Sequence, residues 1–250
     1  MIKERKILNK LINILDYDKT YSPDKNSHIA LIGMNGSGKT MLIKLIMGLY
    51  EDYEGKILIN NIDVKEIDIE DYQKKVSSVF QDYVKYEMSI RENIGFGDIY
   101  NISNEQLVRD QIEKVHLQNK IQKTDSLDLN LGNWFGDFEL SGGEWQRIAI
   151  ARMLMKKAEL FVLDGPDASL DVLKQKEMIK IYEQVIENKI SIYISHKVDY
   201  VHLIANCIYV LVNGEIVEYG EHKQLLNRKE SIISCLKNAM RTGKRLIKNL

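Results

Sequence analysis

The chain has 250 residues, of which 44% are hydrophobic and 28% are charged, and its formal net charge is −1. This composition is ordinary for a soluble globular protein, and the near-zero charge gives no general attraction to nucleic acid or anionic lipid. The longest apolar stretch, residues 201–212, contains His202 and Asn206 and is shorter than the about 20 residues that a membrane-spanning helix needs.

The first third of the chain predicts a strand, a glycine-rich loop, a helix and a hairpin. The apolar run at residues 28–32 leads into the glycines, and residues 41–50 then have apolar side chains at helical spacing. Residues 56–64 alternate about an Asn60-Asn61 turn, which predicts a hairpin. A further short strand, residues 76–80, ends at Gln81.

Residues 82–119 are polar and helical in character, with a helix start at residues 103–106. The elements expected after this block are a loop at 129–139, a helix at 144–155, a buried strand at 160–163 ending in Asp164, a buried strand at 190–194 ending in Ser195-His196, a hairpin at 209–219 about Asn213-Gly214, and a helical, basic C-terminal end.

Strands that alternate with helices predict a mainly parallel sheet that is covered on both faces. We therefore expect an α/β fold with an inserted helical subdomain and a small antiparallel β part. The expected boundaries, within a single domain of residues 1–250, are an α/β core at 1–81 and 156–226, a helical subdomain at 82–155 and a basic tail at 227–250.

The glycine-rich loop has the sequence of a phosphate-binding loop. It reads Gly33-Met34-Asn35-Gly36-Ser37-Gly38-Lys39-Thr40, with Met41 next in the helix that follows. Main-chain N–H groups in such a turn, together with the start of the next helix, bind phosphate anions. Lys39 is expected to reach the β- and γ-phosphates, and the Thr40 hydroxyl to ligate Mg²⁺. The loop predicts a P-loop NTPase that binds ATP or GTP.

A second run, Leu140-Ser141-Gly142-Gly143-Glu144-Trp145-Gln146-Arg147, resembles the signature of ATP-binding cassette (ABC) proteins. A serine and exposed N–H groups at a helix start form an anion site, and Ser141 would also cap the helix with Glu144 at its third position. The resemblance covers residues 7–226 and implies a RecA-like ABC ATPase that uses ATP and Mg²⁺. In that family Ser141, Gly142, Gly143 and Glu144 would contact the ATP held by a neighbouring subunit.

Four further positions match motifs of the same family. Gln81 resembles the Q-loop glutamine, which reaches Mg²⁺ and the attacking water, and residues 82–94 resemble the exporter branch. Asp164, at the end of a buried strand, resembles the Walker B carboxylate that holds Mg²⁺. Residues 168–171, ending in Asp171, resemble the D-loop that touches the opposite subunit. His196 resembles the switch histidine that contacts the γ-phosphate, and with Gln81 it would act in catalysis.

The chain departs from the family pattern directly after Asp164. The family has Asp-Glu-Pro there, whereas this chain has Asp164-Gly165-Pro166. The missing glutamate is the general base, which typically contributes 10²–10⁴-fold to a rate. We therefore expect ATP to bind and hydrolysis at this site to be slow or absent. Another group, such as His196, could still support weak turnover.

A second departure concerns the adenine ring. The family stacks adenine on an aromatic residue of a strand well before the phosphate loop, and residues 7–14 resemble the segment that follows that strand. The strand itself is thus missing from the sequence. Tyr17 and Tyr21 are the available substitutes, although loop tyrosines can equally be incidental. Adenine selectivity is open on the sequence alone.

The resemblance implies an ATP-binding subunit of an ABC exporter on the cytoplasmic, inner face of a membrane. Its partners would be a second ABC ATP-binding subunit, in a homodimer or heterodimer, and a separate transmembrane permease, with no nucleic acid. The alternative is a non-hydrolysing, nucleotide-gated regulatory subunit that completes a partner's active site. A soluble ABC protein of translation or DNA repair fits less well, because such proteins usually carry two cassettes or a long coiled coil.

Overall fold

The computed structural model describes residues 27–59, 62–121, 126–132, 138–165, 172–195 and 200–227, and the statements below concern these residues. Within them, no helix combines the length and the apolar character that a membrane span requires.

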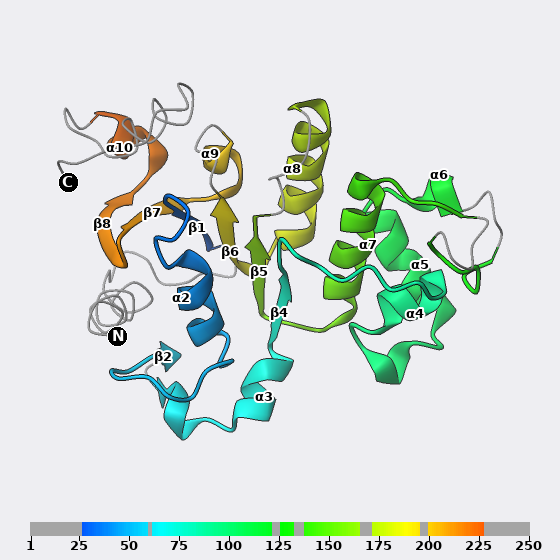
Figure 1. The fold of residues 1–250 in the computed structure, drawn as a ribbon, viewed down its shortest axis with the longest axis horizontal. Helices are drawn as coiled ribbons and strands as arrows, with labels where there is room; N and C mark the ends of the chain where they lie inside the picture. Colours follow the sequence, from blue (N-terminus) through cyan, green and yellow to red (C-terminus); the bar gives the residue numbers. More distant parts are fainter. Residues whose placement is uncertain are drawn as a thin grey trace.

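A six-stranded sheet forms the centre of the fold (Figure 1). Its strands are β1 (His28–Ile32), β4 (Val76–Val79), β5 (Leu160–Asp164), β6 (Ile190–Ser195), β7 (Cys207–Val212) and β8 (Glu215–Gly220). They lie in the order β4-β5-β6-β1-β7-β8, and every neighbouring pair is parallel except β7 and β8. The predicted mainly parallel α/β sheet is confirmed. Because the parallel strands run in one direction, the residues that follow β1, β4, β5 and β6 lie together at the carboxyl-terminal ends of the strands.

Helices pack on both faces of this sheet, against apolar side chains that alternate between the two faces along each strand. Val162 of β5 faces the cluster that contains α2 (Lys39–Ile46), whereas Phe161 and Leu163 face the opposite side. That opposite side is covered by α7 (Gly142–Met155), α8 (Val172–Ile186), α9 (Val201–Ile204) and α10 (His222–Asn227). The apolar stretch at 201–212 is thus divided between α9 and β7.

A helical block lies beside the β4 edge of the sheet (Figure 1). It consists of α4 (Ile90–Gly95), the 3₁₀ helix η2 (Ile99–Asn101), α5 (Glu105–Lys114), α6 (Gln118–Ile121) and the neighbouring α7. Ser89 and Glu92 form a capping box at the start of α4, and Asn104 caps α5, within the helix start predicted at residues 103–106. Capping therefore defines where the two main helices of the block begin.

The small antiparallel part follows α2. Strands β2 (Leu58–Ile59) and β3 (Ile62–Asp63) pair as the predicted hairpin, whose turn residues Asn60 and Asn61 lie outside the described residues. The 3₁₀ helix η1 (Val64–Glu66) and α3 (Ile69–Lys74) come next, and α3 was not predicted.

Two predicted helix boundaries are wrong. Helix α2 begins at Lys39 and ends at Ile46, whereas residues 41–50 were expected to be helical. It ends early because Gly48 has a φ of +69°, a left-handed conformation that stops a helix, and its N–H donates to the carbonyl of Leu45. Helix α7 begins at Gly142, two residues before the predicted start at Glu144.

The hairpin of β7 and β8 supports the phosphate loop. Its turn, Asn213-Gly214, has positive φ at both residues (48° and 82°), as the predicted hairpin turn requires. The N–H of Gly214 donates to the carbonyl of Ser37 at 3.0 Å. A Cβ on Gly33 would collide with the carbonyl oxygen of Leu211 in β7, so glycine is needed there for close packing.

Candidate functional site

The phosphate loop lies between β1 and α2, at the carboxyl-terminal ends of the parallel strands (Figure 1). Gly36 and Gly38 have φ values of +78° and +99°, which side chains rarely adopt. A Cβ placed on Gly36 would meet nothing within 4 Å, so the protein itself leaves space over the loop. The first turn of α2 presents N–H groups that lack intrahelical acceptors, as an anion site requires.

Lys39 lies buried under this loop, with 4% of its surface exposed. Its Nζ donates to the carbonyl oxygens of Gly33 (2.9 Å) and Met34 (3.0 Å) and lies 3.4 Å from the Ser37 hydroxyl. Burial lowers the pKa of Lys39 to about 8, against the opposing effect of the nearby Asp164 charge. No ion pair found among the described residues includes Lys39. A desolvated cation with neutral acceptors is suited to bind phosphate.

The titration of Lys39 predicts opposite effects of pH on folding and on nucleotide binding. Its pKa is about 8 in the folded chain and 10.5 ordinarily, so the unfolded chain binds more protons between these values. The free energy of unfolding is therefore expected to rise with pH in this window, while ATP affinity falls as the amine loses its charge. Urea unfolding and ATP titration at pH 7.5 and 9.5 would measure both. In a Lys39→Met variant the stability difference from wild type should shrink at the higher pH.

Thr40 and Asp164 meet although 124 positions separate them in the sequence. The Thr40 hydroxyl donates to Oδ2 of Asp164 at 2.9 Å, and Asp164 is buried at the end of β5. A hydroxyl and a carboxylate are the hard oxygen ligands that Mg²⁺ prefers. Two of the three predicted metal ligands are thus brought together and fit the ion, which neutralises phosphate charge when it is bound.

Gln81 and Gly165 also lie together, at the ends of β4 and β5. Oε1 of Gln81 is 3.0 Å from the position that a Cβ on Gly165 would occupy. Gly165 has a φ of +58°, and its N–H donates to the carbonyl of Ile194 at 2.9 Å. The position at which the family resemblance implies a general base is therefore next to the predicted water-binding glutamine, in a backbone conformation that favours glycine.

The signature is exposed where α7 begins, whereas Trp145 and Gln146, which follow in that helix, are buried. Ser141 caps α7, because its Oγ accepts from the Glu144 N–H (3.4 Å) and the Ser141 N–H donates to Glu144 Oε2 (2.8 Å). Ser141 and Gly142 are exposed, and a Cβ on Gly142 would meet nothing within 4 Å. Trp145 and Gln146 are buried, and Gln146 donates to the Tyr182 hydroxyl of α8 at 2.9 Å. Residues 141–144, the signature turn, are thus presented to solvent on a fixed helix.

Several predicted residues lie outside the described part of the chain. They are the D-loop residues 168–171 with Asp171, the switch residue His196, Pro166, and the aromatic candidates Tyr17 and Tyr21. The residues that precede His196 and Pro166 in the sequence are described. Ser195, before His196, ends β6 and is in register with Ile32 of β1. Asp164, two residues before Pro166, ends β5 and is in register with Ile194 of β6.

Comparison with known proteins agrees with this geometry. The family model described as "ABC transporter" matches residues 19–168. The chain belongs to the ABC transporter family. Its P-loop fold is the nucleotide-binding domain of that family, and the sequence resemblance is confirmed. The structure is similar to a solved bacterial Atm1-family ABC exporter with ATP bound, with a TM-score of 0.76 and 25% sequence identity over 89% of this chain and 38% of that one.

Relatives within the ABC transporter family include proteins named for transport. The chain is 41% identical to the subtilin transport ATP-binding protein SpaT of Bacillus subtilis, over 81% of this chain and 33% of the relative. It is 40% identical to the nisin transport ATP-binding protein NisT of Lactococcus lactis, over 82% and 34%. An ATP-dependent lipid A-core flippase of Methylobacillus flagellatus is 32% identical over 85% and 36%. The chain spans about a third of the length of these relatives.

Proposed function

We propose that this chain binds ATP with Mg²⁺ and powers export across a membrane as the ATP-binding part of an ABC exporter. The contact between Thr40 and Asp164, beside the buried cation of Lys39, carries the proposal. It joins two of the three expected Mg²⁺ ligands, and the expected phosphate ligand lies beside them at the carboxyl-terminal ends of the strands. The names of the relatives support transport as the use of the nucleotide, and the similarity to a solved ABC exporter supports export.

The exposed signature turn supports a dimer of ATP-binding subunits. A capped helix start with open space over Gly142 can receive a phosphate group from another molecule. In this proposal Ser141, Gly142, Gly143 and Glu144 contact ATP held by the phosphate loop of a second subunit. In the same proposal Asp171 touches the opposite subunit and His196 contacts the γ-phosphate.

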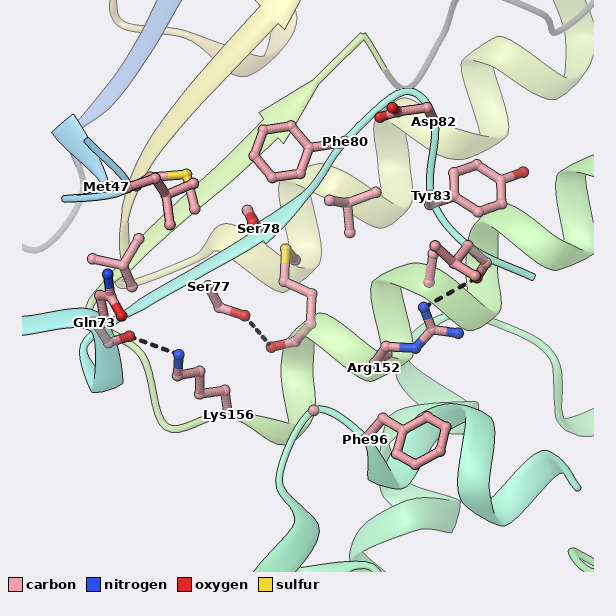
Figure 2. A pocket seen from close by; sticks show the side chains of 17 residues that line it. Met47, Gln73, Ser77, Ser78, Phe80, Asp82, Tyr83, Phe96, Arg152 and Lys156 are labelled. Atoms are coloured by element: carbon pink, nitrogen blue, oxygen red, sulfur yellow. Dashed lines mark hydrogen bonds between the residues drawn. The ribbon is translucent and has the colours of Figure 1, made fainter. Parts of the chain in front are cut away.

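A groove beside the helical block supports a membrane-spanning partner on the inner, cytoplasmic face (Figure 2). The groove has a volume of about 430 Å³ and lies between β4, the residues that follow it, α4 and α7. Phe80, Tyr83 and Phe96 line it, and Val84 and Phe96 expose 54% and 40% of their surfaces. Exposed apolar side chains at a groove, here mixed with polar residues such as Asp82 and Lys156, are typical of an interaction site. The partner is a permease, in a separate chain or joined to this one.

Hydrolysis at this chain's own site is proposed to be impaired by Gly165. A second candidate function follows, in which the chain holds ATP without hydrolysing it and completes a partner's active site through its signature turn. Gly165 favours this candidate, because it offers no side chain at the position beside Gln81 from which a glutamate would act. The two functions differ only in whether the unaltered chain hydrolyses ATP.

Removal of Mg²⁺ and of its expected ligand tests ATP binding at this site. Thr40→Val removes the hydroxyl and nearly preserves the shape of the side chain, so we expect the Mg²⁺-dependent part of the ATP affinity to be lost. That part should amount to about tenfold, as for one ligand of a hard cation. Calorimetric titration with ATP in Mg²⁺ and in EDTA would measure it. In EDTA the variant and the wild type should bind alike, and an unchanged Mg²⁺ effect in Thr40→Val would contradict the assignment.

A further inference from the structure

The residues that follow Gln81 link the nucleotide site to the signature helix. Residues 81–86, here called the Gln81 segment, leave the end of β4 and pass beside α7. Figure 2 shows Asp82 and Tyr83 of this segment above Arg152 of α7. The segment is bonded to α7 at two separate places, near the first and near the last turns of that helix.

The first link joins Tyr83 to the signature turn. The Tyr83 hydroxyl donates to the carbonyl of Gly142 at 3.0 Å. Gly142 is the first residue of α7 and lies between Ser141 and Glu144, which form the capping box. Tyr83 is half-buried against the main apolar cluster, and burial raises its pKa, so the hydroxyl keeps the proton that it donates. The ring is therefore held on the core side while its hydroxyl holds the turn.

The second link joins the other end of the segment to α7 and α4. Arg152 donates to the carbonyls of Val84 (3.2 Å) and Asn93 (2.6 Å), and its guanidinium lies 4.7 Å from the centre of the Tyr86 ring. Two of these contacts, with the Val84 carbonyl and the Tyr86 ring, fix this end of the segment, and the third ties Arg152 to α4. Displacement of the segment must therefore act on α7 and not only on the loop.

The first residue of the segment is Gln81, whose exposed side chain reaches the nucleotide site: its Oε1 lies 3.0 Å from the position that a Cβ on Gly165 would take, next to Asp164 in the sequence. A nucleotide that draws in the Gln81 side chain would displace the segment at its nucleotide end. Tyr83 is two residues further on and bonded to Gly142. The same few residues thus touch the chain's own nucleotide site and the turn that it presents to a second subunit.

We propose that Tyr83 is a positioning residue that couples nucleotide occupancy at this chain's own phosphate loop to the orientation of its signature turn. The proposal rests on the proposed function, in which Gln81 responds to ATP and the signature turn serves a neighbouring subunit. Its consequence is that ATP bound on one side of a dimer prepares the signature that reads ATP on the other side. Of the two links to α7, the Tyr83 hydroxyl is the one that reaches the signature turn itself, and the coupling needs no contact between the two nucleotides.

Amide hydrogen exchange of a Tyr83→Phe variant tests the proposal. The experiment uses protein concentrations at which sedimentation shows a monomer, so that no second subunit touches the signature turn. In the wild type, ATP with Mg²⁺ is expected to change exchange at the phosphate loop, at residues 81–83 and at residues 142–145. In Tyr83→Phe the change at residues 142–145 should fall about two- to tenfold, the range that one neutral hydrogen bond controls, while the other two regions respond as in the wild type.

Tyr86→Phe is the matched control. It removes a hydroxyl from the same segment, and within the described residues that hydroxyl donates no hydrogen bond, so the response of residues 142–145 should match the wild type. Thermal unfolding of both variants verifies the fold. Two results would overturn the coupling alone. In one, ATP leaves amide exchange at residues 142–145 of the wild type unchanged; in the other, exchange there changes as much in Tyr83→Phe as in the wild type. A phosphate loop that does not respond to ATP would overturn the proposed function, and the coupling with it.

Discussion

ATP hydrolysis by the purified chain is expected to be near background and to rise at least about 100-fold in Gly165→Glu, the lower end of the range that a positioned general base supplies. The side chain would start next to Gln81 and Asp164, because a Cβ on Gly165 is 3.0 Å from Gln81 Oε1. The backbone there is anchored to β6 through the bond from Gly165 N–H to the carbonyl of Ile194. A steady-state assay of phosphate release, with ATP and Mg²⁺ in excess, measures the rate.

The structure adds a stability cost to this expected gain. A residue other than glycine at a φ of +58° is strained by about 1–2 kcal/mol. The contact with Gln81 adds little, since the far end of an exposed side chain can move. Gly165→Glu should therefore unfold about 2–8 °C lower than the wild type in the absence of nucleotide.

Gly165→Gln separates the chemistry from the strain. Glutamine has nearly the same size and imposes the same backbone strain, but its amide cannot accept a proton. Gly165→Gln should thus show the lower unfolding temperature and background hydrolysis. Equal activity of the two variants would mean that the glutamate does not act as a base. Robust hydrolysis by the unaltered chain would contradict the impaired site and the non-hydrolysing candidate together.

The sheet and its hairpins could be predicted because their signals are local. The buried strands are short apolar runs, and Asn213-Gly214 has the two residue types that its positive φ values require. Helix α3 was missed because, of its six residues, only Tyr72 is buried. Its remaining signal was Asp68, whose side chain accepts from the N–H of Asp71. One capping residue without apolar periodicity does not distinguish a helix from a turn.

The site was predictable in its parts from the residues, whereas the meeting of Thr40, Gln81 and Asp164 at one Mg²⁺ was implied only by the family resemblance. The phosphate loop and the signature are continuous runs with known chemistry, and the roles assigned to Asp171 and His196 stay predictions. The contact of Thr40 with Asp164 depends on the spatial order of the strands, in which β6 lies between β5 and β1. The bond from Tyr83 to Gly142 ends on a main-chain carbonyl, which any residue provides. Such a bond leaves no pattern in a single sequence.

Lys39→Met is expected to weaken ATP binding by at least about 100-fold while it raises the free energy of unfolding of the nucleotide-free chain by about 1 kcal/mol. Affinity falls because charge-assisted bonds to phosphate are the strongest that the loop makes. Stability rises because the lowered pKa shows that the buried ammonium is disfavoured in the fold. Nucleotide titration and urea unfolding would measure the two effects on the same preparation.

Lys44→Met is the control on the same helix. Lys44 lies in the last turn of α2, where its ammonium is 5.8 Å from the centre of the Phe80 ring, away from the phosphate loop. Its replacement should leave ATP affinity unchanged and the free energy of unfolding within about 0.5 kcal/mol. A Lys39→Met variant that lost stability as well as affinity would show that the ammonium holds the loop together through the carbonyls of Gly33 and Met34. Opposite signs in the two measurements would show instead that the fold keeps an unfavourable charge for the phosphate that it binds.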